Sequence, residues 1–487
     1  MDDMTALLQR ARLGQQLWAA CTRADRLAVV RRFRQRLAAQ AAALAATVPA
    51  SLQRLPGETL LAEVLPLLDA CRFLERRANA LLAPRRLGWR YRPCWLAGVS
   101  TVLYREPLGV VLVLGPSNYP LWLPGVQILQ ALVAGNAVLC KPGAGGSAAL
   151  TALKGWLMEA GLDERLVILL PEEVASGTAA LRAGVDHVVL TGSASTGAAV
   201  LEALAPSLVP ATLELSGCDA AFVRADANLE LTARALAFSM RFNGGATCIA
   251  PRRVFVAAEL ATALEQRLQQ LVAALPSCQL APELAARLRT VVQEACQAGG
   301  QLLAGHWDSA ISCTPLLVTR ATPAMRLMQE EFFAPVLALM SVRDDAEALT
   351  AAASCRYALG ATVFGEMAGA RALAARVRAG VVVVNDVMVP TADPRLPFGG
   401  RGRSGFGVTR GAEGLLTFTA LKAVAARRGS WRPHFAPLCA ADEVWIQAYI
   451  TAAHGGGGWR RLQAVLALWR ALLARWLASK RQEEMVG

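Results

Sequence analysis

Apolar residues at helical spacing dominate residues 1–84 of the chain. The clearest run recurs at steps of three and four, with arginines between its members: Leu27, Val30, Phe33 and Leu37. Such a stripe is typical of an amphipathic helix that buries one face. We therefore expect this part of the chain to form helices. The next segment, residues 89–106, has bulky side chains on both sides of Gly98 and predicts a β-hairpin.

From Pro107 onward, short runs that are apolar throughout alternate with longer, helix-like segments. Four such runs precede Thr191: residues 109–115, 136–142, 166–170 and 187–190. Strands of this kind are buried on both faces, as in parallel β-α-β units. The pattern is less regular between Leu213 and Asn385, where residues 381–384 (VVVV) predict one more buried strand. The alternation predicts an α/β protein with two lobes.

The composition indicates a folded protein without a membrane-spanning segment. Of the 487 residues, 54% are hydrophobic and 18% are charged, which excludes a disordered chain. No uninterrupted apolar run reaches the ~18 residues that a spanning helix needs. Residues 1–12 lack the apolar core of a signal peptide. The 11 cysteines include no CxxC pair, so we expect reduced thiols and a cytoplasmic location.

The chain is basic, with 50 basic against 37 acidic residues and a net charge of +13. The arginines are scattered and no nucleic-acid-binding motif accompanies them, so we expect no nucleic-acid partner. Attraction to an anionic membrane surface or to anionic substrates is the better interpretation. Lysine is rare in this arginine-rich chain, so a lysine inside a motif carries more information than usual.

Several catalytic chemistries are excluded by what the sequence lacks. The four histidines show neither metal-ligand spacing nor a nucleophile motif. We therefore expect no metal site, and neither a zinc enzyme nor a Ser-His-Asp hydrolase. No GxxxxGK[ST] phosphate-binding loop is present. An enzyme with this sequence would use a carboxylate as its base and a cysteine or serine as its nucleophile.

Two segments could supply that base and a phosphate site. Residues 191–197 (TGSASTG) follow a strand and precede a helix, where free backbone N–H groups can hold a phosphate. An ordinary strand-to-helix turn is the alternative. Glu214 lies in ATLELSG, at the end of a buried strand. Burial there would raise its pKa and suit a general base, although pairing with an arginine is the alternative.

A third segment could supply the nucleophile. Cys248 lies in RFNGGATCIAPRR (residues 241–253), where glycines and small residues would let a substrate approach the sulfur. Arg252 and Arg253 add positive potential, which favours a thiolate. One more buried cysteine among 11 is the alternative.

Taken together and in order, these segments resemble the aldehyde dehydrogenase superfamily. The similarity runs from about Tyr104 to Val424 and covers roughly two thirds of the chain. Beside TGSASTG, LELSG and FNGGATC, it rests on five further motifs: PLGVVLVLGPSNYP (107–120), GNAVLCKP (135–142), EEFFAPV (330–336), AGVVVVN (379–385) and PFGGRGRSGFG (397–407). The short part before Pro107 resembles the class 3 branch, which includes fatty aldehyde dehydrogenases.

The resemblance implies a Rossmann-like cofactor domain, an α/β catalytic domain and a small β oligomerisation arm. We assign residues 1–214 to the N-terminal helices and the NAD(P)-binding domain, with the hairpin arm at about 89–106. Residues 215–400 would form the catalytic domain, and 401–430 the return segment and oligomerisation strand. Residues 431–487 would be a C-terminal extension. An arm that adds a strand to a partner's sheet predicts a homodimer, with a tetramer as the alternative.

The resemblance also implies an oxidation of an aldehyde to a carboxylic acid. Cys248 would attack the aldehyde carbon as a thiolate. The Asn118 side-chain amide and the Cys248 backbone N–H would hold the oxyanion. Hydride would pass to the nicotinamide and leave a thioester, which water activated by Glu214 would hydrolyse. An apolar aldehyde is the expected substrate, because Trp122 lies near Asn118 and the loops are rich in apolar residues.

NAD or NADP is the implied cofactor, and six residues would bind it. Lys141 would contact the adenosine ribose, Glu331 the nicotinamide ribose and Phe333 the cofactor beside it, with the pyrophosphate near Gly192, Ser193 and Gly197. The sequence departs from the family where a carboxylate commonly follows the Lys-Pro pair, because Ala144 stands there. The absence of that charge makes NADP acceptable.

Two other functions remain open at this point. A CoA-acylating or acyl-reducing relative would pass the acyl group to a thiol, but such relatives commonly lack a base at the position of Glu214. An inactive, membrane-recruited scaffold would not need Asn118, Glu214, Cys248 and Glu331 to be intact.

The last segment predicts an amphipathic, basic helix over residues 459–481. Its apolar residues recur at steps of three and four: Trp459, Leu462, Val465, Leu466, Trp469, Leu472, Leu473 and Trp476. Basic residues surround or follow this face: Arg460, Arg461, Arg470, Arg475, Lys480 and Arg481. A helix lying in a membrane interface fits this pattern, and packing against this protein or a partner subunit is the alternative. GGGG (residues 455–458) would be a flexible linker before it.

Overall fold

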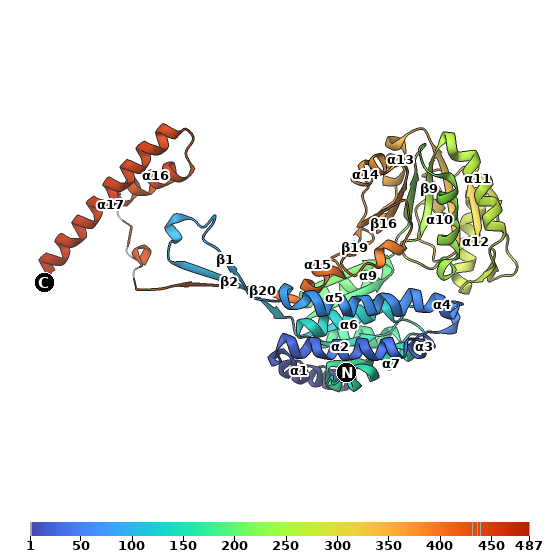
Figure 1. The fold of residues 1–487 in the computed structure, drawn as a ribbon, viewed down its shortest axis with the longest axis horizontal. Coiled ribbons are helices and arrows are strands. Elements are labelled where there is room, and N and C mark those ends of the chain that lie inside the picture. Colours follow the sequence, from blue (N-terminus) through green and yellow to red (C-terminus); the bar gives the residue numbers. More distant parts are fainter. Residues whose placement is uncertain (1, 431, 436, 439, 487) are drawn as a thin grey trace. The chain divides into compact units, whose positions relative to one another are not determined.

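The computed structural model describes residues 2–430, 432–435, 437–438 and 440–486, and the side chains of 475–486 are outside that description (Figure 1). The chain forms two compact units. One comprises the chain up to Leu87 together with Val102–Val424, and the other comprises Gly88–Thr101 together with the chain from Ala425 onward.

The predicted N-terminal helices are present. They are α1 (Asp2–Ala20), α2 (Arg23–Ala39), α3 (Ala41–Ala45), α4 (Pro56–Thr59), the π-helical turn η2 (Leu60–Val64) and α5 (Leu65–Leu81). The stripe predicted on α2 faces the core, because Leu27, Val30, Phe33 and Leu37 are all buried. Thr22 and Asp25 form a capping box that satisfies free N–H groups at the start of α2.

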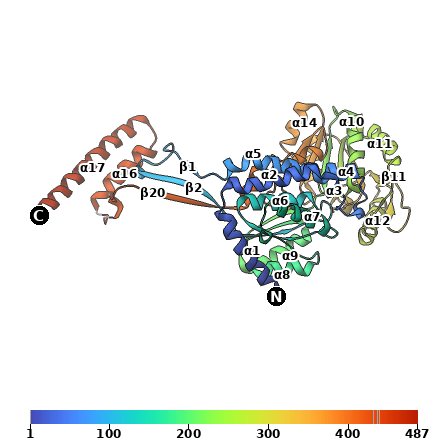
Figure 2. The same ribbon diagram turned by 60° about the horizontal axis from the view of Figure 1, so that its bottom comes forward.

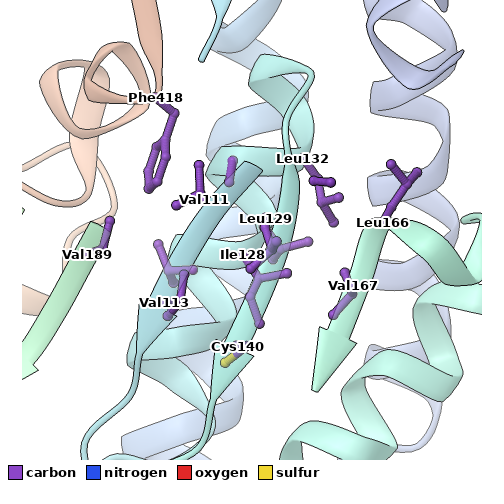
Figure 3. Packing of buried hydrophobic residues seen from close by; sticks show 14 of the residues in the cluster. Val111, Val113, Ile128, Leu129, Leu132, Cys140, Leu166, Val167, Val189 and Phe418 are labelled. Atoms are coloured by element: carbon purple, nitrogen blue, oxygen red, sulfur yellow. The ribbon is translucent and has the colours of Figure 1, made fainter. Parts of the chain in front are cut away.

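A six-stranded sheet follows, in the order β19-β7-β6-β3-β4-β5. Its strands are β3 (Val110–Leu114), β4 (Ala137–Lys141), β5 (Val167–Leu169), β6 (His187–Gly192), β7 (Ala211–Leu215) and β19 (Gly405–Phe406), and all pairs except β19–β7 are parallel. The intervening helices are α6 (Trp122–Ala134), α7 (Ser147–Glu159), α8 (Val174–Ala183) and α9 (Ala194–Leu204). Figure 3 shows Val111 and Val113 of β3 packed beside Ile128 and Leu129 of α6.

A seven-stranded sheet forms the second lobe, in the order β11-β13-β14-β9-β8-β16-β17. Its strands are β8 (Asp219–Val223), β9 (Pro251–Ala257), β11 (Gln301–Ala304), β13 (Leu316–Thr319), β14 (Val336–Val342), β16 (Gly360–Phe364) and β17 (Val381–Val384). Its helices are α10 (Leu229–Arg241), α11 (Ala258–Ala273), α12 (Pro282–Gln297), α13 (Asp345–Ala353) and α14 (Met367–Ala374). In both ribbon views α10, α11 and α12 lie together in this lobe, whereas α2, α5, α6 and α7 lie together in the other (Figures 1 and 2). The two-lobed α/β prediction is confirmed.

The predicted hairpin at 89–106 differs in detail. A three-stranded sheet in the order β1-β2-β20 contains β1 (Arg85–Leu87), β2 (Val99–Pro107) and β20 (Thr419–Arg427). The first strand therefore ends before Trp89, and an 11-residue connection with a short helical turn at Cys94–Leu96 joins it to β2. The prediction placed the hairpin around Gly98, but residues 88–98, which include Pro93 and three aromatic residues, form a longer loop instead.

Two C-terminal helices lie side by side in the second unit (Figure 1). They are α16 (Ala440–His454), which the sequence did not predict, and α17 (Gly458–Val486), which contains the predicted 459–481 helix. The glycine run forms the turn between them. Four side chains of the predicted 459–481 helix lie outside the described part of the structure: Trp476 of the apolar face and the basic residues Arg475, Lys480 and Arg481. Within the described residues, no helix is both long and apolar enough to cross a membrane.

Candidate active site

The carboxyl edge of the six-stranded sheet gathers most of the predicted residues. β3 leads into the loop that carries Asn118, β6 ends at Gly192, and β7 carries Glu214 next to its end. In a parallel sheet the carboxyl ends of the strands share one edge, and ligands bind outside it. Pairing of Thr191 with Glu214 in the β6–β7 register fixes the carboxylate beside the end of β6.

A sharply bent segment places Cys248 opposite this edge. Asn243, Gly244 and Gly245 have positive φ values of 55°, 57° and 72°. At Gly245 a Cβ atom would lie 2.7 Å from the carbonyl carbon of Ala334, so only glycine allows the close approach. The Arg252 guanidinium donates a hydrogen bond to the Gly245 carbonyl. This bend presents the Cys248 sulfur to the site.

Asn118 is tied to the same bend. Its side-chain Nδ2 donates to the Ala246 carbonyl at 2.8 Å, two residues before Cys248. An amide nitrogen carries two protons, so the second remains for an oxyanion at the sulfur. The side-chain amide of Asn243 also donates to the Asn118 carbonyl at 3.3 Å. The loops of Asn118 and Cys248 are therefore held against each other.

A buried ion pair from the N-terminal helices supports both loops, and the sequence analysis missed it. Arg54 Nη1 lies 2.6 Å from Glu63 Oε1, with both side chains almost fully buried. Arg54 Nε donates to the Asn243 side chain at 2.7 Å and Nη2 donates to the Asn118 carbonyl. Glu63 accepts from the Trp122 N–H at 2.7 Å. A single arginine thus connects the oxyanion residue with the cysteine loop.

Glu214 has the surroundings of a strong base. It is 3% exposed, and its Oε2 accepts a hydrogen bond of 3.0 Å from the Thr409 hydroxyl. Its Oε1 has no hydrogen-bond partner among the described residues. Burial raises the pKa of Glu214, against the opposing effects of Arg410, Thr409 and Thr191. One carboxylate oxygen is therefore free to take a proton from a reactant.

Arg252 interacts electrostatically with Cys248, as its predicted positive potential requires, but the overall surroundings of the sulfur do not favour a thiolate. Both guanidinium groups are used by main-chain carbonyls, those of Gly245 and Thr247 for Arg252 and those of Cys218 and Ala352 for Arg253. Burial, followed by the charges of Glu214 and Asp219, raises the pKa of Cys248 to about 12. Attack by this sulfur therefore needs a nearby acceptor for its proton.

Two cavities meet at Cys248 and Glu214. The first, of about 560 Å³, is lined by these two residues and mostly by apolar side chains, including Leu61, Trp122, Phe238, Phe242, Met388 and Phe398. The second, of about 530 Å³, shares Cys248 and Glu214 and adds Asn118, Thr191, Gly192, Ser193, Glu331 and Phe333. Two reactants, one in each cavity, can therefore both reach the Cys248 sulfur.

The second cavity fits a dinucleotide. Glu331 lines it, and its buried Oε2 has no hydrogen-bond partner among the described residues, as a carboxylate awaiting a ribose hydroxyl would have. Ser193 caps the N-terminus of α9, whose free N–H groups suit a pyrophosphate. Gly197 does not line this cavity. A Cβ there would lie 2.7 Å from Leu215 Cδ1, so Gly197 lets α9 approach β7.

Lys141 lies at the end of β4 and does not line the second cavity, although Ala144 does. Its Nζ donates to the Pro142 carbonyl at 2.9 Å. The sequence analysis missed an acid beside it. Glu172 accepts from the backbone N–H groups of Gly145 at 2.7 Å and Ser147 at 2.8 Å. Burial lowers the pKa of Lys141, and the negative charge of Glu172 opposes that effect.

Comparisons with known proteins agree with this geometry. Residues 1–424 match the model of the aldehyde dehydrogenase family. The chain is similar to the 4,4'-diapolycopene aldehyde oxidase of Methylomonas sp, with 29% identity over 85% of this chain and 79% of that protein. It is 31% identical to the NADP(+) succinate-semialdehyde dehydrogenase of Deinococcus radiodurans, over 87% of this chain and 90% of that one.

A solved structure shows the same architecture. The NADP-dependent glyceraldehyde-3-phosphate dehydrogenase of Bacillus halodurans C-125, in complex with NADP, superimposes with a TM-score of 0.82 at 26% identity, over 88% of this chain and 91% of that one. The family model spans most of the chain, the relatives match nearly its whole length, and the fold around the buried Cys–Glu site is shared. This chain therefore belongs to the aldehyde dehydrogenase family, whose members oxidise aldehydes to acids with NAD or NADP.

Proposed function

We propose that this enzyme oxidises a large apolar aldehyde, with Cys248 as nucleophile, Glu214 as base and Asn118 as oxyanion ligand. The observation that carries the proposal is the junction of two cavities at Cys248 and Glu214. The apolar lining of the first cavity favours a bulky hydrophobic substrate. The Methylomonas relative is named for 4,4'-diapolycopene aldehyde, which supports an aldehyde substrate here.

In the mechanism that follows, the Cys248 proton leaves toward the free oxygen of Glu214 as the sulfur attacks the aldehyde carbon. The oxygen of the resulting thiohemiacetal lies toward the second Nδ2 proton of Asn118. A bound nicotinamide would supply the hydride acceptor, and Glu331 would hold its ribose. Glu214 then passes the Cys248 proton to solvent and is again a free carboxylate. The thioester left on Cys248 is hydrolysed by water whose proton Glu214 accepts. Glu214 therefore serves twice.

A CoA-acylating reaction is not favoured, because Glu214 can activate water and the thioester would then be hydrolysed rather than transferred to CoA.

The substrate class is tested by incubating the enzyme with a long-chain aldehyde, an aromatic aldehyde or a short semialdehyde, with NAD or NADP and with or without CoA. We expect kcat/KM to rise with apolar size and no dependence on CoA. A preference for the short semialdehyde would contradict the proposed substrate class.

We propose NADP use within about tenfold of NAD in kcat/KM, a difference of about 1.4 kcal/mol. Ala144 offers no carboxylate to repel a 2′-phosphate, but Glu172 lies close to Lys141. Replacing Glu172 with glutamine should therefore raise the NADP/NAD ratio by about two- to fivefold. Glu202→Gln, at an exposed position of α9, is the matched control. A wild-type preference for NAD above a thousandfold would exclude dual use.

We also propose that the domain boundaries lie near residues 214 and 400 and that the enzyme belongs to the class 3 branch. The six-stranded sheet takes its parallel strands from Val110 to Leu215, and the seven-stranded sheet begins at Asp219, which supports the first boundary. A homodimer is supported by β20, an edge strand whose side chains are mostly exposed. Sedimentation of the full-length protein tests the dimer.

Membrane attachment through α17 is a further part of the proposal. Trp469 is 72% exposed, and the apolar face around it is exposed too: Trp459, Leu462, Val465, Leu466, Leu472 and Leu473. The side that is shielded carries Ala464 instead. Exposed Arg460, Arg461 and Arg470 add positive charge near this face. A face of tryptophans and leucines flanked by arginines suits the interface of an anionic membrane.

Flotation with anionic liposomes tests this attachment. We expect the double variant Leu466→Glu, Trp469→Glu to lose about tenfold or more of the bound fraction, as should a truncation after His454. Leu208→Glu is the control, because Leu208 is an exposed apolar residue of the first unit. Equal binding by wild type and the double variant, or no binding by wild type, would contradict membrane attachment.

A further inference from the structure

Arg410 is a buried cation in the wall of the first cavity. It is 5% exposed, and its backbone has a positive φ of 60°, which is uncommon for a residue with a Cβ. Its guanidinium lies 4.1 Å from the ring centre of Phe398 and 5.0 Å from that of Trp122. Nη1 donates to the Thr391 carbonyl at 2.7 Å. The fold therefore holds a strained residue so that a charge sits inside an apolar pocket.

Among the described residues, neither the Arg410 guanidinium nor the Glu214 carboxylate has hydrogen-bond partners for all of its polar atoms. Arg410 Nε and Glu214 Oε1 are both buried without a hydrogen-bond partner in the part of the chain that the structure describes. Both residues and Cys248 line the same cavity. The preceding residue, Thr409, donates to the other oxygen of Glu214 at 3.0 Å. Two consecutive residues thus face the base, one with a hydrogen bond and one with a charge.

We propose that Arg410 is a positioning residue that favours the anionic forms of Glu214 and of the reacting sulfur by placing a permanent positive charge in their cavity. A guanidinium stays protonated at any pH at which the enzyme works. Without it, the Glu214 carboxylate and a developing Cys248 thiolate would face each other with no opposing charge. Asp219 adds a negative charge near the sulfur above its own pKa, which burial raises to about 8. The inference rests on the roles proposed above for Glu214 and Cys248.

Four other charged residues line this cavity, Glu58, Asp69, Arg241 and Asp393, but none is among the main charges that act on Glu214 or Cys248. Thr191 and Thr409 are neutral partners of Glu214, and Tyr119 is a neutral phenol near Cys248. Arg252 interacts with Cys248 but is bound to the carbonyls of Gly245 and Thr247. Arg410 is the positive group that acts on Glu214 and Cys248 together.

The test compares Arg410→Met, Arg410→Gln and Arg410→Lys, with Arg395→Met as control. Arg395 is an exposed arginine of the same loop region, paired with Asp393. Two quantities are measured from pH 6 to about 10: the rate of Cys248 alkylation by iodoacetamide, and kcat for aldehyde oxidation. Both follow the fraction of the anionic form.

We expect the neutral variants to shift both rising limbs upward by about one pH unit, so that each rate falls about tenfold at a given pH on the limb and is regained when the pH is raised by about one unit. Lysine should keep both profiles within about threefold of wild type. A uniform loss at every pH, or an unchanged profile, would overturn the charge role. If Arg410→Met does not fold, Arg410→Gln replaces it, because glutamine can still donate a hydrogen bond to the Thr391 carbonyl. In either case Arg410→Lys must keep the wild-type pH profile. If wild-type enzyme keeps its activity after Cys248 is fully alkylated, the proposed role of Cys248 as nucleophile is wrong.

Discussion

Replacing Cys248 with alanine is expected to lower aldehyde oxidation by roughly 10⁴-fold or more, because no thiohemiacetal or thioester can form without the sulfur. Binding of NAD or NADP should persist, since the second cavity keeps Ser193, Glu331 and Phe333. The measurement pairs steady-state kinetics with cofactor titration by fluorescence.

Cys296→Ala provides the control for this variant. Cys296 is an exposed, free cysteine of α12, so its loss should leave turnover within about twofold. Substantial oxidation by the Cys248 variant would mean that another residue is the nucleophile.

Glu214→Gln is the second change with a large expected effect. The amide keeps the shape of the carboxylate and can still accept the Thr409 hydrogen bond, but it cannot take a proton. We expect steady turnover to fall by about 10²- to 10⁴-fold, with a single burst of reduced cofactor of up to one equivalent per site. In wild type, turnover should climb with pH, because the raised pKa of Glu214 means that the base becomes free of its proton only at higher pH.

Stopped-flow absorbance separates the two roles given to Glu214. A burst followed by arrest assigns it mainly to hydrolysis of the thioester, whereas loss of the burst assigns it also to deprotonation of Cys248. Steady turnover equal to that of wild type would remove Glu214 from the mechanism. Glu202→Gln, which also serves the cofactor test, controls for the loss of one acidic group.

The elements that the sequence predicted are those whose pattern is local. The apolar runs of β3, β4, β6 and β17 are visible because a strand covered on both faces has no polar positions. The stripe of α2 is visible because one helical face is buried. Helix α16 was missed because its apolar residues do not form a regular stripe. The hairpin arm was misplaced because its 11-residue connection carries no tight-turn signature that would mark where the first strand ends.

The active-site residues also divide into those that a local sequence motif marks and those that no motif marks. Cys248, Glu214 and Asn118 stand in short motifs that can be read along the chain. Arg54, Glu172 and Arg410 stand in no such motif, because each acts on residues far away in sequence. Arg54, for example, reaches Asn243 across 189 positions. In a chain with so many arginines, nothing in the sequence distinguishes Arg54 and Arg410 from the others.

The buried pair of Arg54 and Glu63 has a consequence for the order in which activity appears during folding. The two α/β lobes supply Cys248, Glu214 and Asn118, but the ion pair that links their loops comes from the helical segment before the sheets. Losing one member of a buried ion pair costs about 3–5 kcal/mol, so the catalytic loops gain their final order only when this helical segment has docked. On heating, loss of activity should therefore coincide with release of the N-terminal helices and precede melting of the sheets. The part of the chain without any reacting group would set the thermal limit of the enzyme.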